Sequence, residues 1–251
     1  MRKPHFHTTI FMFLLLFPVL SLATDTITPT TPITVNQTLV SNQQVFELGF
    51  FSLDNNNNNN NWYIGIWYKQ IEPKTYVWVA NRGNPVNSSS GKLTIGGNGN
   101  IILFNQPETA VWTSNDSNHS VRAVKRVAQL LDSGNFVLRP KGDERPESYI
   151  WESFKNLTDT LLPGMRLGWD RKTGVNRFLR SWKSGMDPGS SSYTFKMNVD
   201  GFPEIFLSAW VKPVFRSGPW NGRRFSGVPT SRGVRLMELW FVNNYVLRIE
   251  I

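Results

Sequence analysis

Two aromatic stretches, Trp62–Tyr68 and Tyr76–Ala80, lie on either side of a polar turn at residues 72–74. Successive side chains of an extended strand point to opposite faces, so the even-numbered residues of each stretch should share one face. Residues 81–85 (NRGNP) supply a second turn. Nothing in this segment is arranged for covalent chemistry. The pattern predicts a β-sheet sandwich or prism with a tryptophan-rich core.

The first 23 residues have the pattern of a secretory signal peptide. Arg2 and Lys3 give a basic start, an apolar run extends from Ile10 to Leu22, and small residues precede a cleavage site after Ala23. A membrane anchor needs about 20 apolar residues, and this run is shorter. We therefore expect a secreted protein of the extracellular space, in the cell wall or apoplast.

Several residue types that carry chemistry are missing. The chain has no Cys, which excludes a thiol nucleophile, a zinc–thiolate site and disulfides. Of its 3 His, only His119 lies outside the signal peptide, in a polar loop. We therefore expect no enzymatic activity, no metal site and no cofactor.

The charge of the chain bears on its partners. The formal net charge is +9, which favours anionic partners such as pectin-like polymers, an acidic peptide or a membrane surface. The Lys and Arg residues are scattered and do not form a cluster, so nucleic-acid binding is not expected.

Short strands recur at intervals of about 8–12 residues, which is typical of all-β folds. The first half is expected to contain strands at 45–51, 62–68, 76–80, 92–95, 100–104, 111–113, 127–131 and 135–138. The second half is expected to contain strands at 149–154, 177–182, 193–199, 203–207, 214–217, 236–241 and 245–251. No run has helical periodicity. Residues 24–42 are expected to lie along the surface, and the charged segment Pro140–Ser148 is expected to be a linker.

Five Asn-x-Ser/Thr sequons indicate glycosylated surface loops in a secreted chain. They begin at Asn36, Asn87, Asn115, Asn118 and Asn156.

Several phrases, taken together and in order, resemble the plant S-domain proteins. These are the S-locus glycoproteins and the extracellular part of the S-locus receptor kinases, of the bulb-type mannose-binding lectin family. The phrases are FELGFF (46–51), WYIGIWY (62–68), YVWVANR (76–82), LDSGNFVL (131–138), DTLLP (159–163), LRSWKS (179–184), RSGPWNG (216–222) and FSGVP (225–229).

This resemblance implies an all-β chain of tandem β-prism II domains, with a bulb-type lectin domain at 24–145 and a second lectin-like domain at 146–251. Family members continue into cysteine-rich modules, and the receptors add a membrane helix and a kinase. The sequence stops before those parts, inside an expected strand, which suggests an incomplete second prism, a truncated allele or a fragment of a longer gene. The protein would be membrane-bound only if the gene continues into a receptor. An unfinished sheet would leave an unpaired edge that could support dimerisation.

Bulb lectins bind mannose with the pattern Gln-x-Asp-x-Asn-x-Val-x-Tyr, whose spacing of two places five side chains on one strand face. At 96–104, Asn100 and Ile102 fit the pattern, but Phe104 stands in place of the Tyr, and glycine and asparagine replace the Gln and Asp. At 131–139, Asn135 and Val137 fit, and the other three positions do not.

Each pocket therefore lacks three polar partners, each worth roughly 0.5–1.5 kcal/mol. We interpret both pockets as vestigial, and Asn100 and Asn135 as turn or strand-start residues. Their neighbours Ile101, Leu103, Phe136 and Leu138 are expected in the core.

In the receptors of this family the ectodomain recognises a small secreted cysteine-rich peptide through loops of the second lectin-like domain. Mapped by motif, these loops correspond to residues 208–212 and 223–235. They contain six residues of types common at interfaces, namely Trp210, Lys212, Arg223, Arg224, Arg232 and Arg235. Taken singly, Trp210 is interpreted as core and the arginines as solvated, but as a patch they are the best candidate binding site.

Three hypotheses follow for the function. The first is a secreted recognition module related to pollen recognition and self-incompatibility, with a small cysteine-rich peptide or a related receptor ectodomain as its partner. The second is a mannose-binding lectin that binds glycans in defence or cell-wall sensing. The third is a truncated, non-functional allele.

Overall fold

The computed structural model describes residues 24–53, 61–87, 90–106, 109–114, 125–170, 173–198 and 200–228, together with the backbone of 238–242 and 246–250. This part of the chain is all-β, as expected. Its only helical turns are two short 3-10 helices, η2 (Pro146–Ser148) and η3 (Ser153–Lys155).

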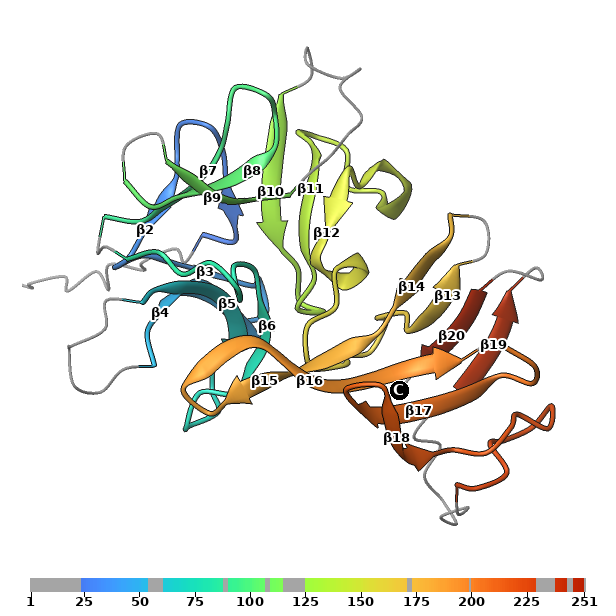
Figure 1. The fold of residues 1–251 in the computed structure, drawn as a ribbon. Helices are drawn as coiled ribbons and strands as arrows, with labels where there is room; N and C mark the ends of the chain where they lie inside the picture. The colour runs from blue at the N-terminus through green and yellow to red at the C-terminus, as the bar shows by residue number, and fades with distance from the viewer. Residues whose placement is uncertain are drawn as a thin grey trace, which may run out of the picture.

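The first unit, from Thr24 to Lys155, is a prism of three four-stranded antiparallel sheets (Figure 1). One sheet contains β1 (Thr26–Ile27), β10 (Arg126–Leu130), β11 (Phe136–Pro140) and β12 (Trp151–Glu152), in that order. The next contains β2 (Ile33–Thr34), β7 (Lys92–Ile95), β8 (Ile101–Phe104) and β9 (Ala110–Thr113). The third contains β3 (Thr38–Val40), β4 (Phe46–Phe51), β5 (Tyr63–Tyr68) and β6 (Tyr76–Val79).

The segment 24–42 does not lie along the surface, so that expectation was wrong. It supplies β1, β2 and β3, which are edge strands of all three sheets in turn. Ile27, Ile33 and Leu39 point into the core and are at most 3% exposed. Burying such side chains stabilises the fold by roughly 1.5–3 kcal/mol each, which outweighs the weak strand propensity of a Thr- and Pro-rich segment.

The three sheets enclose one hydrophobic core. Ile101, Leu103, Phe136 and Leu138 are at most 1% exposed, as their alternation predicted. At one point of the prism, one tryptophan from each sheet meets the other two. Trp78, Trp112 and Trp151 lie edge to face, with ring centroids 5.6–6.1 Å apart.

The aromatic stretches behave as predicted with one exception. Ile64 and Ile66 of β5 and Trp78 of β6 face the prism core. Tyr76 instead lies on the outer face, beside Trp67, because the pairing of β5 with β6 has a register shift between Ile66 and Trp67. A bulge adds one residue to a strand and so moves a side chain to the opposite face.

The second unit contains two further four-stranded antiparallel sheets (Figure 1). One contains β14 (Val175–Arg177), β13 (Gly168–Asp170), β20 (Val246–Glu250) and β19 (Glu238–Val242), in that order. The other contains β15 (Leu179–Ser184), β16 (Asp187–Asn198), β17 (Glu204–Ala209) and β18 (Lys212–Arg216). A small core of Leu167, Met197, Ile205 and Phe225 lies beneath them.

The junction between the two units differs from the expectation of a linker at 140–148 followed by a strand of the second domain. Pro140 ends β11, and η2 lies inside the segment 140–148. Trp151 and Glu152 form β12, which pairs with β11 and so completes a sheet of the first unit. The limits of the two domains remain a prediction, but this strand belongs to the first unit.

The two units contact each other through Arg82 and Trp182. The Arg82 guanidinium donates to the carbonyls of Pro188, Arg180 and Ser181 at 2.5, 2.9 and 2.9 Å. Burial lowers the pKa of Arg82, although a guanidinium stays protonated at neutral pH. The Trp182 ring lies 6.0 Å from that of Tyr76.

Candidate functional site

A polar clamp recurs at the same place in each sheet of the first unit. The backbone N–H of a residue at the start of a middle strand donates to a side-chain oxygen. The residue that carries this oxygen comes just after the edge strand in the sequence. Ile64 donates to Asn81 at 2.8 Å, Ile101 to Ser114 at 3.1 Å, and Phe136 to Ser153 at 2.9 Å. The clamp therefore marks equivalent positions, and the residue just before each clamped N–H is Tyr63, Asn100 or Asn135.

The first position aligned with the lectin pattern lies on β8. Asn100 is 9% exposed, and its side-chain oxygen accepts a hydrogen bond from Ser114 at 3.5 Å. Ile102 and Phe104 are half-buried on the outer face. A Cβ at Gly96, where the lectin pattern has Gln, would clash with the Ile102 side chain. A larger residue at this position would have to move the terminal methyl group of Ile102.

The second position aligned with the lectin pattern lies on β11. Both the oxygen and the nitrogen of the Asn135 side-chain amide form hydrogen bonds there. Its oxygen accepts from the Ser153 hydroxyl and the Phe154 N–H, both at 3.2 Å, and its nitrogen donates to Glu152 at 3.0 Å. Val137 is fully buried. These bonds fix η3 against β11 and use the groups that a sugar would require.

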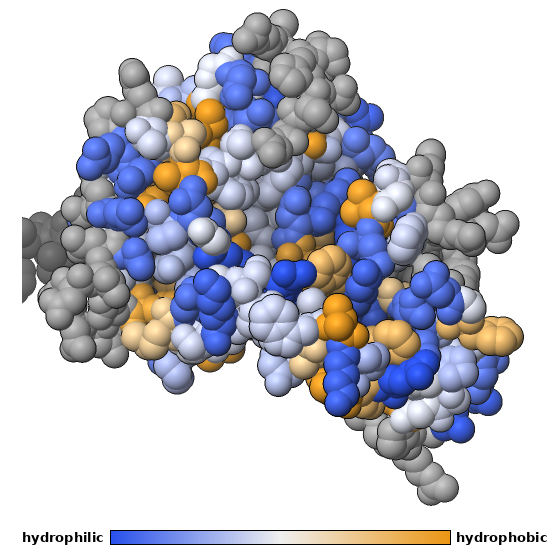
Figure 2. All heavy atoms as spheres, in the orientation of Figure 1, coloured by the Kyte–Doolittle hydropathy of each residue, from blue (hydrophilic) through white to orange (hydrophobic). Residues whose placement is uncertain are grey.

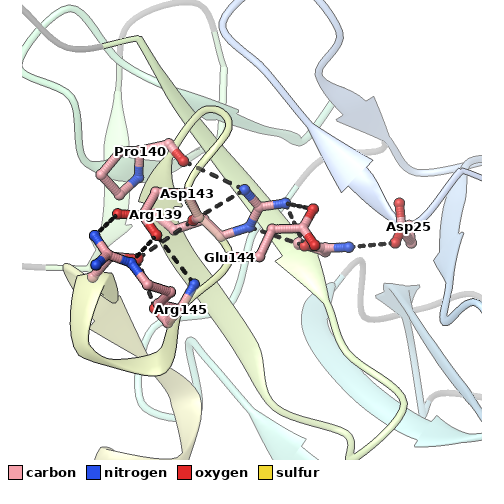
Figure 3. Close-up of polar contacts among 8 residues, drawn as sticks. Asp25, Arg139, Pro140, Asp143, Glu144 and Arg145 are labelled. Atoms are coloured by element: carbon pink, nitrogen blue, oxygen red, sulfur yellow. Dashed lines mark hydrogen bonds and ion pairs between the residues drawn. The ribbon is translucent and has the colours of Figure 1, made fainter.

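Arg139 occupies the place of the lectin tyrosine in this second pocket (Figure 3). It is 5% exposed, and its guanidinium donates to Gln129 at 2.8 and 3.0 Å. It also reaches Glu144 at 3.2 Å and the carbonyls of Pro140 and Asp143 at 3.3 Å each. Five acceptor contacts leave little donor capacity for a ligand.

Neighbouring side chains extend this network in both directions. The Gln129 amide donates to Asp25 at 2.7 Å, which joins β10 to the start of the chain. Two hydrogen bonds from Arg145 hold the pKa of Asp143 well below its usual range (Figure 3). The cluster is a structural network that closes the second pocket.

Sequence reasoning missed the third equivalent position, on β5. There Tyr63 and Trp67 join Phe51 and Val79 in an aromatic cluster on the outer face, against which Trp182 of the second unit packs. Glu47 beneath the cluster accepts hydrogen bonds from Trp67 at 2.9 Å and Thr38 at 2.7 Å. The residues at this position match no lectin pattern. Only the threefold repeat of the strands could have located it. All three faces are thus occupied by the chain's own side chains.

The candidate ligand loops of the second unit are open to solvent. Trp210 and Val211 form the tip of the β17–β18 hairpin and are 81% and 96% exposed, so the interpretation of Trp210 as core was wrong. Trp210 has φ of 57°, in the left-handed region that favours glycine. Its N–H donates to the carbonyl of Ser192 at 2.8 Å, and Lys212 follows, also exposed. A bulky side chain is thus held outward at some cost in backbone energy.

Arg223 and Arg224 lie in a second, separately organised loop. Both backbone N–H groups donate to the Asn221 side chain, at 3.0 and 2.9 Å, and both residues are exposed. The loop follows Trp220, whose ring lies 5.2 Å from that of Phe225. Arg232 and Arg235 fall outside the described residues.

Three of the five sequon asparagines can be placed. Asn36, Asn87 and Asn156 are exposed, and Asn115 and Asn118 fall outside the described residues. The Asn156 carbonyl also accepts the indole N–H of Trp78 at 2.9 Å, so this site adjoins the tryptophan cluster. No helix in the described ranges is long and apolar enough to span a bilayer.

Comparisons with known proteins agree with the lectin-like geometry. The D-mannose binding lectin family matches residues 75–183, a range that crosses from the first unit into the second. The receptor-like serine/threonine-protein kinase SD1-8 of Arabidopsis thaliana is 48% identical over 95% of this chain and 28% of its own length. The S-locus-specific glycoprotein S6 of Brassica oleracea is 43% identical over 97% of this chain and 56% of its own.

A looser likeness in shape exists to solved lectins. The monomeric mannose-binding lectins from Gastrodia elata align with a TM-score of 0.37 and 15% identity, over 52% of this chain and 96% of theirs. The chain spans little more than half of S6 and about a quarter of SD1-8.

Proposed function

Since this chain is a homologue of the S-locus glycoproteins and S-domain receptor kinases and carries a D-mannose binding lectin domain, we propose that it is a secreted recognition module of the S-domain class. It binds a small secreted cysteine-rich protein through the loops of its second unit, in a role related to pollen recognition and self-incompatibility. It acts by docking, without catalysis and without a cofactor.

The observation that carries this proposal is the β17–β18 hairpin. Trp210 is held outward at positive φ and is 81% exposed. The positive φ is what a two-residue hairpin turn requires, but the exposed indole adds little to the core, so the side chain itself is available to a partner. Tryptophan is also among the residues that dominate interface energies.

The charge near the hairpin supports an acidic or mixed-charge protein partner. Lys212, Arg223 and Arg224 are exposed on the two candidate loops. Basic loops around an aromatic anchor steer an oppositely charged partner and raise its association rate. The occupied lectin faces of the first unit support recognition by loops over recognition of a sugar.

The test is binding to cysteine-rich peptides that bind a full-length relative. We expect the purified chain to bind at least one of them, and Trp210→Ala to weaken that binding by about tenfold or more. Phe202→Ala is a matched control, because it removes another exposed aromatic side chain that lies outside the two candidate loops. A chain that binds none of these peptides, or whose affinity is unchanged by Trp210→Ala, would contradict the proposal.

A mannose-binding lectin is the second candidate, favoured by the lectin family match at residues 75–183. Its remaining candidate side chains are Ile102 and Phe104, which stay half-exposed on β8. A glycan array competed with free mannose tests this function. Signal lost in Phe104→Ala would support it, and a blank array would count against it.

A further inference from the structure

The outer face of the β15–β18 sheet carries a row of cations and phenyl rings distinct from the loops above. Lys196 on β16, Phe206 on β17 and Arg216 on β18 are direct cross-strand neighbours. Arg216 lies 4.8 Å from the centroid of the Phe206 ring. The row therefore crosses at least three adjacent strands.

The row continues toward β15 through a second ring. Phe178 lies between two cations, with the Arg180 guanidinium 5.4 Å and the Lys196 ammonium 5.7 Å from its ring centroid. Stacking on a ring restrains a long cationic side chain and holds its charge at the surface. The cations are thus arranged before any ligand arrives.

The charge balance of the row is positive. Glu204 is the carboxylate that faces it, and Arg216 neutralises that group with two hydrogen bonds, at 2.8 and 3.1 Å. Arg180 and Lys196 form no ion pair with any residue that the structure describes. Two unneutralised cations therefore remain, and an anionic ligand complements them.

The arrangement suits an acidic unit that contains a ring. The two unneutralised cations, Arg180 on β15 and Lys196 on β16, lie 5.4 and 5.7 Å from the centroid of the same Phe178 ring. An acidic sugar can therefore place its pyranose ring beside Phe178 and its carboxylate against either cation. A further unit of the same polymer can reach Arg216, which stands two strands from Lys196, about 10 Å across the sheet.

We propose that this outer face, marked by Phe178, Arg180, Lys196, Phe206 and Arg216, binds a linear acidic polysaccharide of uronate units. Carboxylates on successive sugars pair with the cations, and the pyranose rings lie against the phenyl edges between them. Figure 2 shows hydrophilic and hydrophobic side chains mixed over the part of the molecule formed by β15–β18.

The experiment measures binding of the full chain to immobilised polygalacturonate at low and at physiological ionic strength. We expect binding that weakens as salt rises. Methyl esterification of the polymer should abolish it, because esters carry no charge. Arg180→Gln with Lys196→Gln should reduce affinity by about tenfold or more, since two charge contacts are lost.

The matched control is Lys125→Gln with Lys141→Gln, which removes the same charge from exposed positions of the first unit. Its affinity should stay within about twofold of the unmodified chain. Equal losses in both double variants would show attraction by net charge alone and would overturn the proposal. Equal binding to poly-glutamate would overturn it in favour of an acidic polypeptide.

A third variant tests whether the phenyl rings contribute to binding in addition to the positive charge. Phe178→Leu keeps both cations but removes the ring between them, so it should weaken binding to polygalacturonate without changing the net charge. Unchanged affinity in this variant would contradict the stacked arrangement. Unaltered thermal unfolding would establish that each variant is folded.

Discussion

The spacing of Asn135 in the sequence suggests sugar binding, whereas its contacts in the structure are those of a structural residue. It fits the lectin pattern, yet all of its side-chain hydrogen bonds go to residues 152–154. The carbonyl oxygen holds a clamp serine and a backbone N–H of η3, so the side chain links two elements across a sheet edge. Its role is to close the sheet.

Asn135→Ala should therefore lower stability. The change leaves buried partners without acceptors, and one such loss costs about 1–3 kcal/mol. We expect the free energy of unfolding in urea to fall by at least about 2 kcal/mol.

The control for this prediction is Asn36→Ala, an exposed residue of the turn before β3. With both variants made without glycans, Asn36→Ala should change stability by no more than about 0.5 kcal/mol. An Asn135→Ala protein as stable as the unmodified chain would show that the side chain is not structural.

At this scale the sequence predicted which residues sit in each pocket but not what they touch. Asn100 and Asn135 could be aligned by spacing alone. Their partners Ser114 and Ser153 lie 14 and 18 residues further along the chain. No local pattern links residues so far apart, and the pairing follows from the register of the strands.

Among the elements, β8 carries the side chains that align with the first lectin pattern. Gly96 lies before the β7–β8 turn, and Ile102 covers it from the facing strand. A larger residue at position 96 would have to displace that isoleucine. The glycine and isoleucine therefore fit each other as a pair.

Gly96→Ala should destabilise the protein by no more than about 1 kcal/mol, because the half-exposed Ile102 side chain can turn its terminal methyl group away. Ile102→Val removes the terminal methyl group that the new Cβ would meet. We expect the double variant to recover part of the loss, which a double-mutant cycle of unfolding free energies would measure. Purely additive effects would show that the two side chains do not meet.

In the β17–β18 hairpin we expect a substitution to raise stability. Trp210→Gly relieves the positive φ and removes little buried surface, so stability should rise by about 1 kcal/mol. Val211→Gly, at the neighbouring position without positive φ, should lower stability instead. Thermal unfolding of both variants checks this, and a less stable Trp210→Gly protein would contradict the assigned strain.

Strands with strong alternation were predicted well, including β4, β5, β7 and β8. The elements missed were β1, β2, β3, β13 and, apart from its last residue, β14. Each is two or three residues long and is held by pairing with a stronger neighbour. The bulge that moves Tyr76 to the outer face also leaves no trace in the sequence.

For the whole molecule, Arg82 is the main polar link between the units. Its planar guanidinium meets three carbonyls of the β15–β16 hairpin at once. The aromatic cluster of Phe51, Trp67 and Tyr76 lies next to this contact and is closed by Trp182. Polar and apolar contacts therefore fix the same interface.

Arg82→Ala should uncouple the units. Hydrogen bonds to a charged donor contribute about 1.5–3 kcal/mol each, so losing them should let the second unit unfold at a lower temperature than the first. Calorimetry should show two transitions in place of one. Arg82→Lys should behave similarly, because an ammonium lacks the planar fork.

Arg145→Ala serves as the control, since Arg145 is an exposed arginine paired with Asp143 inside the first unit. It should leave the unfolding profile with a single transition. Retention of one transition in Arg82→Ala would show that the apolar contacts, including Leu157 and Leu161 packed against both cores, couple the units without Arg82.

The pairing of the first strands with much later ones affects how the chain folds during synthesis. Asp25 and its partner Gln129 are 104 residues apart in sequence. At a synthesis rate of about 5–20 residues per second, β1 waits roughly 5–20 s for β10 to leave the ribosome. During that interval Ile27 has no sheet to join, so its apolar side chain stays unburied until β10 has been synthesised and the prism can close.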